Sequence, residues 1–356
     1  MEKQTTIYCS MGLLNHISEM FSLSFKNENV EAILIWTNWY NLILDKSQLF
    51  VDIDMDKIQR LSDENSLIRS LIRGNSRQSQ KSQITPMPDF FTENRFEDIY
   101  PANSIFLLDK TKEECAELEN QHGMIFISKE NLFERAKLLF SSALYNVTKD
   151  SKAIRSFKNW EELQNFRHPF NAMIVVDNFI LDTDKSKKNL ISLLSNFLPL
   201  TLEKQILDLI IITNNQRRLN NGETQKYNLD SKYKEINAEI QKLRSYQINI
   251  SLIIVDANQN HDRNIFTNYF WLHSGHSFDY FNDKDEVTNP TNLMIFPIFY
   301  QQDKISPQQN TVYEAVYQLL QEIKIIVDNS ATQSERTEKK IIEKNACGNK
   351  QNRLLS

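Results

Sequence analysis

The 356-residue sequence is poor in the residues that interrupt regular structure, with only six glycines and eight prolines. This composition argues against a turn-rich all-β fold and favours continuous helices and strands. Its three cysteines, Cys9, Cys115 and Cys347, are too few and too scattered for a disulfide framework or a zinc site. We therefore expect a cytoplasmic protein without a bound metal or other cofactor.

Long apolar runs are missing as well. None approaches the roughly 20 residues that a membrane-spanning helix needs, and residues 1–10 lack the charged-then-apolar pattern of a signal peptide. The net charge is −5, so the chain as a whole does not attract nucleic acid or an anionic membrane. Binding to either must come from a local basic patch.

Aromatic and aliphatic residues are plentiful, and the chain is long enough for two domains of about 100–200 residues. Short apolar runs alternate with amphipathic segments throughout, which predicts an α/β fold. We expect a small α/β domain of unknown type over residues 1–150, with a small parallel sheet. A second α/β domain should cover residues 151–328, and the polar tail of residues 329–356 should be disordered.

The second half has the clearest strands. Three apolar runs predict buried strands, namely Ala172–Ile180, Ile206–Thr213 and Asn249–Val255, and the first two of them are followed by helical patterns. Strands that alternate with helices in this way form a mostly parallel sheet covered on both faces. In the first half, the run Val30–Trp36 predicts a further buried strand, and Lys129–Tyr145 predicts a long helix.

A polar, histidine-rich stretch directly follows the strand Asn249–Val255. Its spacing matches the motif H-x-K-x4-D-x6-G-S-x2-N at six positions: His261, Arg263, Asn268, Gly275, His276 and Asp279. Only the histidine and the glycine are identical to the motif. The stretch resembles the phospholipase D superfamily, and most of all the phospholipase D-like C-terminal domain of MIT-domain proteins. The resemblance covers about residues 165–328 and implies an α/β sandwich with a phosphodiesterase-type site.

The residue types at this site predict oxyanion binding independently of the resemblance. Alternation along a strand places His261 and Arg263 on one face, and a planar guanidinium is suited to an oxyanion such as phosphate. The motif implies catalytic roles for His261, Arg263 and Asn268, which we expect to line one pocket at the carboxyl edge of the sheet. Four more residues are predicted phosphate contacts: Gly275, His276, Arg217 and Arg218.

Three functions are compatible with such a site. The first is a catalytically degenerate module that binds phosphate, most simply nucleic-acid backbone, inside a larger assembly such as a bacterial antiviral defence complex. The second is a metal-independent phosphodiesterase or nuclease, which would need a homodimer that pairs two copies of His261. The third is binding of a lipid head group at a membrane surface, which the acidic chain disfavours.

A weaker signal comes from the first half, where Asp52, Asp54 and Asp56 alternate along the chain. Lys57 stands where a calcium-binding EF-hand loop needs glycine, so that interpretation fails. Together with Asp109, these carboxylates have the composition of a two-metal nuclease centre. The alternative is a solvated junction between a strand and a helix.

Overall fold

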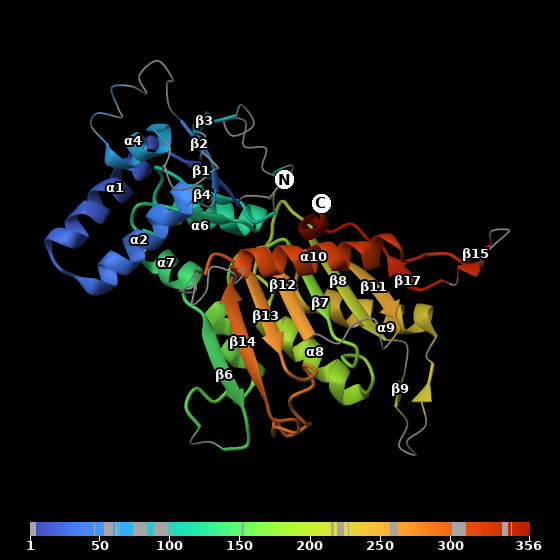
Figure 1. Ribbon diagram of the computed structural model, residues 1–356. Coiled ribbons are helices and arrows are strands. Elements are labelled where there is room, and N and C mark those ends of the chain that lie inside the picture. The colour runs from blue at the N-terminus through green and yellow to red at the C-terminus, as the bar shows by residue number, and fades with distance from the viewer. Residues whose placement is uncertain are drawn as a thin grey trace. The chain divides into compact units, whose positions relative to one another are not determined.

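The computed structural model describes residues 5–45, 47–52, 60, 63, 65–73, 84–88, 99, 102–150, 153–214, 217–218, 224–226, 228–256, 263–300, 311–336, 341–342 and 344–356. The chain has two compact units (Figure 1). The first consists of Met1–Ser141 with Phe299–Asp303, and the second of Ser142–Ile298 with Lys304–Ser356. The α/β fold predicted from the sequence is confirmed.

The first unit is built on a parallel five-stranded sheet in the order β3-β2-β1-β4-β5. Its strands are β1 (Thr5–Cys9), β2 (Ser47–Val51), β3 (Ile84–Pro86), β4 (Ile105–Leu107) and β5 (Ile125–Ile127). The small parallel sheet expected here is therefore confirmed. The strand order reverses between β1 and β4, and such a reversal marks the crevice where open α/β sheets place ligands.

The helices of the first unit are α1 (Met11–Lys26), α2 (Val30–Asp45), α4 (Ser66–Arg73), α6 (Lys112–His122) and α7 (Leu132–Phe140). The predicted strand Val30–Trp36 is wrong, because this run begins α2. The buried residues Trp36, Trp39 and Ile43 recur at helical spacing, whereas Val30 is 79% exposed. A 16-residue apolar pattern is also too long for a typical strand.

The second unit is built on an eight-stranded sheet in the order β17-β11-β8-β7-β12-β13-β14-β6. Its strands are β6 (Ala143–Val147), β7 (Ala172–Val176), β8 (Leu207–Asn214), β11 (Ile248–Val255), β12 (Arg263–Thr267), β13 (Phe270–Ser274), β14 (Thr291–Pro297) and β17 (Ala346–Gly348). The predicted helix Lys129–Tyr145 is α7 followed by β6. We expected the second domain to begin after residue 150. The second unit begins at Ser142 instead, because β6 pairs with β14 in this sheet.

The expectation of a mostly parallel sheet is wrong for the second unit. Among the strands that the structure describes, only β7–β8 and β8–β11 pair in parallel in this sheet. The other neighbours are antiparallel, from β7 through β12, β13 and β14 to β6. The reason is the stretch of residues 263–274, which forms a tight β12–β13 hairpin and leaves no residues for a crossover helix.

The main helices of the second unit are α8 (Asp184–Phe197), α9 (Leu229–Ile240) and α10 (Val312–Asp328), with a short 3₁₀ helix, η2 (Trp160–Phe166). Figure 1 shows α8 and α9 behind the strands and α10 crossing in front of them. Parallel strands of one sheet are almost always joined by right-handed crossovers, so β7–α8–β8 and β8–α9–β11 are expected to place both helices on one face. The central strand β7 is buried along its whole length.

The tail differs from its predicted disorder. Residues Ala346–Gly348 form β17, which pairs antiparallel with β11 at the edge of the large sheet. Asn352 then donates from Nδ2 to the carbonyl oxygens of Met173 and Asp208 at 3.2 and 3.1 Å. The prediction of disorder used the polar composition of the tail, and composition does not show that the tail binds backbone groups of the large sheet. In the part of the chain that the structure describes, no helix has both the length and the apolar character to cross a membrane.

Candidate functional site

The carboxyl ends of β7, β8 and β11 lie at one edge of the large sheet, and the open end of the β12–β13 hairpin lies at the same edge. Asn264 pairs with Val176, the last residue of β7, and Arg263 pairs with Ser274, the last residue of β13. Arg263 therefore lies where β7 ends, and Gly275 follows its cross-strand neighbour. The structure thus brings Arg263, Gly275 and His276 to the same edge.

Arg263 is partly exposed and lies over an aromatic ring. Its guanidinium carbon is 5.7 Å from the centroid of Phe179, which follows β7 and is 39% exposed. A guanidinium at this distance is attracted to the negative face of the ring. Both side chains of the pair remain partly accessible to solvent.

Asp177 connects two loops at this edge through hydrogen bonds. It is the first residue after β7 and is fully buried. Its Oδ2 accepts hydrogen bonds from Ser277 Oγ and from the Phe278 backbone nitrogen, both at 2.7 Å. Its Oδ1 accepts one from the Phe179 backbone nitrogen at 2.9 Å. One carboxylate therefore ties the turn that carries Phe179 to the loop that follows β13.

Burial raises the pKa of Asp177 to about 6, although its three hydrogen bonds favour the charged form. The native state therefore keeps this proton to a higher pH than the unfolded chain does. The resulting stabilisation is complete below about pH 4 and is lost as the pH rises through about 6.

This pKa predicts a pH-dependent stability that an isosteric variant removes. We expect the unfolding free energy of the wild type to fall by about 3 kcal/mol more than that of Asp177→Asn as the pH rises from about 4 to above about 6. Urea denaturation at several pH values measures this difference. Parallel pH profiles for the two proteins would show that Asp177 does not titrate in this range.

The loop after β13 is further held by a chain of hydroxyl groups. Tyr280 donates from its hydroxyl to Ser274 Oγ at 2.7 Å, and Ser274 Oγ donates to the His276 carbonyl oxygen at 2.6 Å. Gly275 lies against Thr291, whose Oγ1 would be 3.0 Å from a Cβ at that position. Gly275 and His276 are both exposed. The loop therefore presents them to solvent on a fixed backbone.

Asn268 does not belong to this site, which corrects the predicted pocket. It follows β12 at the opposite end from Arg263, about 16 Å away along an extended strand, and is 1% exposed. Its Oδ1 accepts from the backbone nitrogens of Asn171 and Ala172 at 3.1 and 3.0 Å. Its Nδ2 donates to Asn171 Oδ1 at 3.0 Å. Asn268 therefore joins the amino end of β7 to the hairpin and is not positioned to act with Arg263.

The remaining motif positions have mixed outcomes. Arg217 and Arg218 form β9, which follows β8 at the carboxyl edge and pairs with β10 (Thr224–Gln225). His261 lies outside the described residues. Asp279, at the last motif position, forms an ion pair with Lys185 at 3.3 Å. The acidic residue that follows β7, Asp177, can be recognised in the sequence, but its role as the anchor of the loop after β13 cannot.

In the first unit, Asp52 and Asp109 follow β2 and β4 at the carboxyl edge of the parallel sheet. Asp54 and Asp56 lie outside the described residues. No group of three or more histidine, cysteine, aspartate or glutamate side chains suited to a metal ion occurs among the residues that the structure describes. The four-carboxylate centre considered from the sequence is therefore not seen in the described part of the chain.

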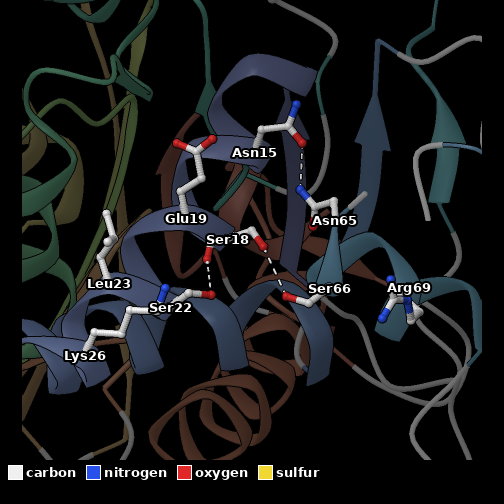
Figure 2. Close-up of a pocket in the computed structure, with 9 residues that line it drawn as sticks. All are labelled: Asn15, Ser18, Glu19, Ser22, Leu23, Lys26, Asn65, Ser66 and Arg69. Atoms are coloured by element: carbon white, nitrogen blue, oxygen red, sulfur yellow. Dashed lines mark hydrogen bonds between the residues drawn. The ribbon is translucent and has the colours of Figure 1, made fainter. Parts of the chain in front are cut away.

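A separate open cavity of about 660 Å³ lies between α1 and α4 in the first unit (Figure 2). Asn65 donates from Nδ2 to Asn15 Oδ1 at 2.6 Å, and the hydroxyl oxygens of Ser18 and Ser66 are 3.3 Å apart. Asn65 Oδ1 also accepts from the Leu67 backbone nitrogen at 2.8 Å and so caps α4. These polar groups join the two helices, and no sequence pattern indicated the cavity.

Comparison with known proteins does not assign the chain to a family. No protein-family model matches the sequence, and a search of curated proteins found no match. The likeness to the phospholipase D superfamily therefore remains a hypothesis that depends on the motif spacing alone.

Proposed function

We propose that the second unit binds the phosphate backbone of single-stranded nucleic acid and does not cleave it. The observation that carries this proposal is the position of Arg263. It lies at the carboxyl edge of the sheet, over Phe179 and beside a loop with a fixed backbone. Ligands of open α/β sheets bind at the carboxyl ends of the strands.

The chemistry of Arg263 suits phosphate. A guanidinium is permanently charged, and its planar donors match two phosphate oxygens at once. The aromatic contact with Phe179 reduces the side-chain freedom that a ligand would otherwise have to restrict. The chain is acidic overall, so binding depends on this local site.

Nucleic acid is favoured over a small phosphate compound because several suitable groups follow the same edge. Phe179 offers an exposed ring, and His276 is exposed on the neighbouring loop. The β9 residues Arg217 and Arg218 follow β8 at this edge. Cations that alternate with aromatic rings are typical of single-strand binding surfaces, where the bases stack and the phosphates pair.

Binding without cleavage follows from the position of Asn268. In the motif this place belongs to a carboxylate of the catalytic set, but here the amide is buried and bonded to Asn171 and Ala172. The side chain at the carboxylate position therefore lies away from the edge that carries Arg263. We expect no hydrolysis of the bound strand.

The test is the affinity of the full chain for a fluorescein-labelled oligodeoxythymidine, measured by fluorescence anisotropy. Arg263→Ala should weaken binding about 10- to 100-fold, because a charged hydrogen bond contributes about 1.5–3 kcal/mol. The slope of log K against log salt should also become shallower by about 0.7 for each phosphate that Arg263 neutralises in the wild type. Melting curves should change little, because Arg263 is only partly buried.

Lys204→Ala is the matched control, because Lys204 is an exposed cation in the loop before β8, at the amino edge of the same sheet. It should bind the oligonucleotide as the wild type does. Equal weakening by both substitutions would indicate a diffuse charge effect and no site. Unchanged binding by Arg263→Ala, with a wild-type melting curve, would refute the proposal.

A further inference from the structure

The carboxyl edge of the parallel sheet in the first unit gathers three oxygen-bearing side chains that the proposed function does not use. They are Ser10 after β1, Asp52 after β2 and Asp109 shortly after β4. β1 lies between β2 and β4, at the point where the strand order reverses. This is the place where a doubly wound sheet holds its ligand.

The strand register places Ser10 beside Asp52. Tyr8 stacks on Phe50 of β2 and on Phe106 of β4, with ring centroids 5.0 and 4.9 Å apart. Side chains two residues further along a strand point to the same face. Because Cys9 pairs with Val51 in parallel, the next row on the Tyr8 face contains Ser10 and Asp52. Ser10 keeps an extended backbone conformation, so this alternation continues through it.

The two carboxylates flank the first turn of α1. The Met11 backbone nitrogen donates to Asp52 Oδ1 at 2.5 Å, a bond that does not use Oδ2. Asp109 lies against Gly12, where a Cβ would be 3.3 Å from Asp109 Oδ2. Glycine at this position therefore allows the second carboxylate to approach the helix closely. Burial raises the pKa of Asp52, and the neighbouring Asp109 raises it further.

Ser10 supplies an independent sign of a missing partner. It is 6% exposed, and its hydroxyl oxygen makes no hydrogen bond to any residue that the structure describes. It is also the N-cap residue of α1, yet its side chain does not cap the helix. Buried hydroxyl groups in native proteins almost always have a partner, so this one is suited to an atom that binds next to Asp52.

We propose that Ser10, Asp52 and Asp109 bind a divalent cation of the Mg²⁺ or Mn²⁺ type. Such hard cations prefer oxygen ligands, and Mg²⁺ typically takes one or two carboxylates and fills its remaining positions with water or phosphate oxygens. The cation relieves the repulsion between Asp52 and Asp109 and gives the Ser10 hydroxyl a partner. The site lies within the first unit and does not depend on the phosphate site of the second.

The proposal is tested by titrating the full chain with Mn²⁺, followed by electron paramagnetic resonance, and with Mg²⁺ by calorimetry. The wild type should bind one Mn²⁺ at this edge. Asp109→Asn should weaken Mn²⁺ binding at least tenfold, and Ser10→Ala should weaken it by a smaller factor. Asp150→Asn is the control, because Asp150 is an exposed carboxylate of the second unit, and it should leave this binding unchanged.

Melting curves without metal separate a cation site from a structural carboxylate. Asp109→Asn should melt no lower than the wild type, because it removes a repulsion, and should lose the stabilisation that Mn²⁺ gives. If the wild type does not bind Mn²⁺, or if both Asp109→Asn and Ser10→Ala bind it as tightly as the wild type, the proposal fails. Ser10 would then be satisfied by an ordered water molecule.

Discussion

Replacing Asp177 with alanine should lower the unfolding free energy of the second unit by about 3–5 kcal/mol, because each buried donor left unpaired costs about 1–3 kcal/mol. The carboxylate accepts hydrogen bonds from Ser277 Oγ and from the backbone nitrogens of Phe179 and Phe278. None of these bonds survives the substitution. Urea denaturation followed by tryptophan fluorescence measures the loss, because Trp160 stacks on Tyr280 in the same unit.

Ser277→Ala is the matched control for Asp177→Ala. It removes one donor and leaves the carboxylate with its two backbone partners, so we expect a loss of about 1 kcal/mol. Hydrogen exchange at the Phe278 amide should accelerate strongly in Asp177→Ala and only slightly in Ser277→Ala. Equal effects of the two substitutions would mean that the carboxylate does not anchor the loop.

Replacing Asn268 with alanine should destabilise the second unit by about 2–4 kcal/mol, because it leaves the backbone nitrogens of Asn171 and Ala172 without an acceptor. The affinity of the folded variant for the oligonucleotide should stay at the wild-type value, since Asn268 is at the far end of β12 from Arg263. Denaturation and anisotropy on the same protein measure both properties. A variant that melts like the wild type but no longer binds would place Asn268 in the site after all.

Much of the second unit could be predicted from local patterns. The buried strands β7, β8 and β11 are apolar runs, the first two followed by helical spacing, and each was expected from the sequence. The antiparallel pairing of β7 with the β12–β13 hairpin was not expected, because the direction of neighbouring strands depends on a turn and on long-range contacts that no local period records. The same holds for β17, which is stabilised by partners far earlier in the chain.

The candidate site stays a prediction. The motif lies directly after the predicted strand Asn249–Val255, and in the structure Arg263, Gly275 and His276 lie at the carboxyl edge of that sheet. Spacing alone could not show that Asn268 lies at the other end of β12, because a motif gives separation along the chain and not direction in space. The anchoring role of Asp177 depends on Ser277, which is 100 residues away in sequence.

The most direct test of the proposed function is photocrosslinking of the full chain to an oligonucleotide that carries 5-iodouracil, followed by mapping of the crosslinked peptides by mass spectrometry. We predict crosslinks at Phe179 or His276, and we predict that Arg263→Ala removes them while Lys204→Ala does not. Crosslinks confined to the first unit, or to the loop around Lys204, would contradict a nucleic-acid site at the carboxyl edge of the large sheet.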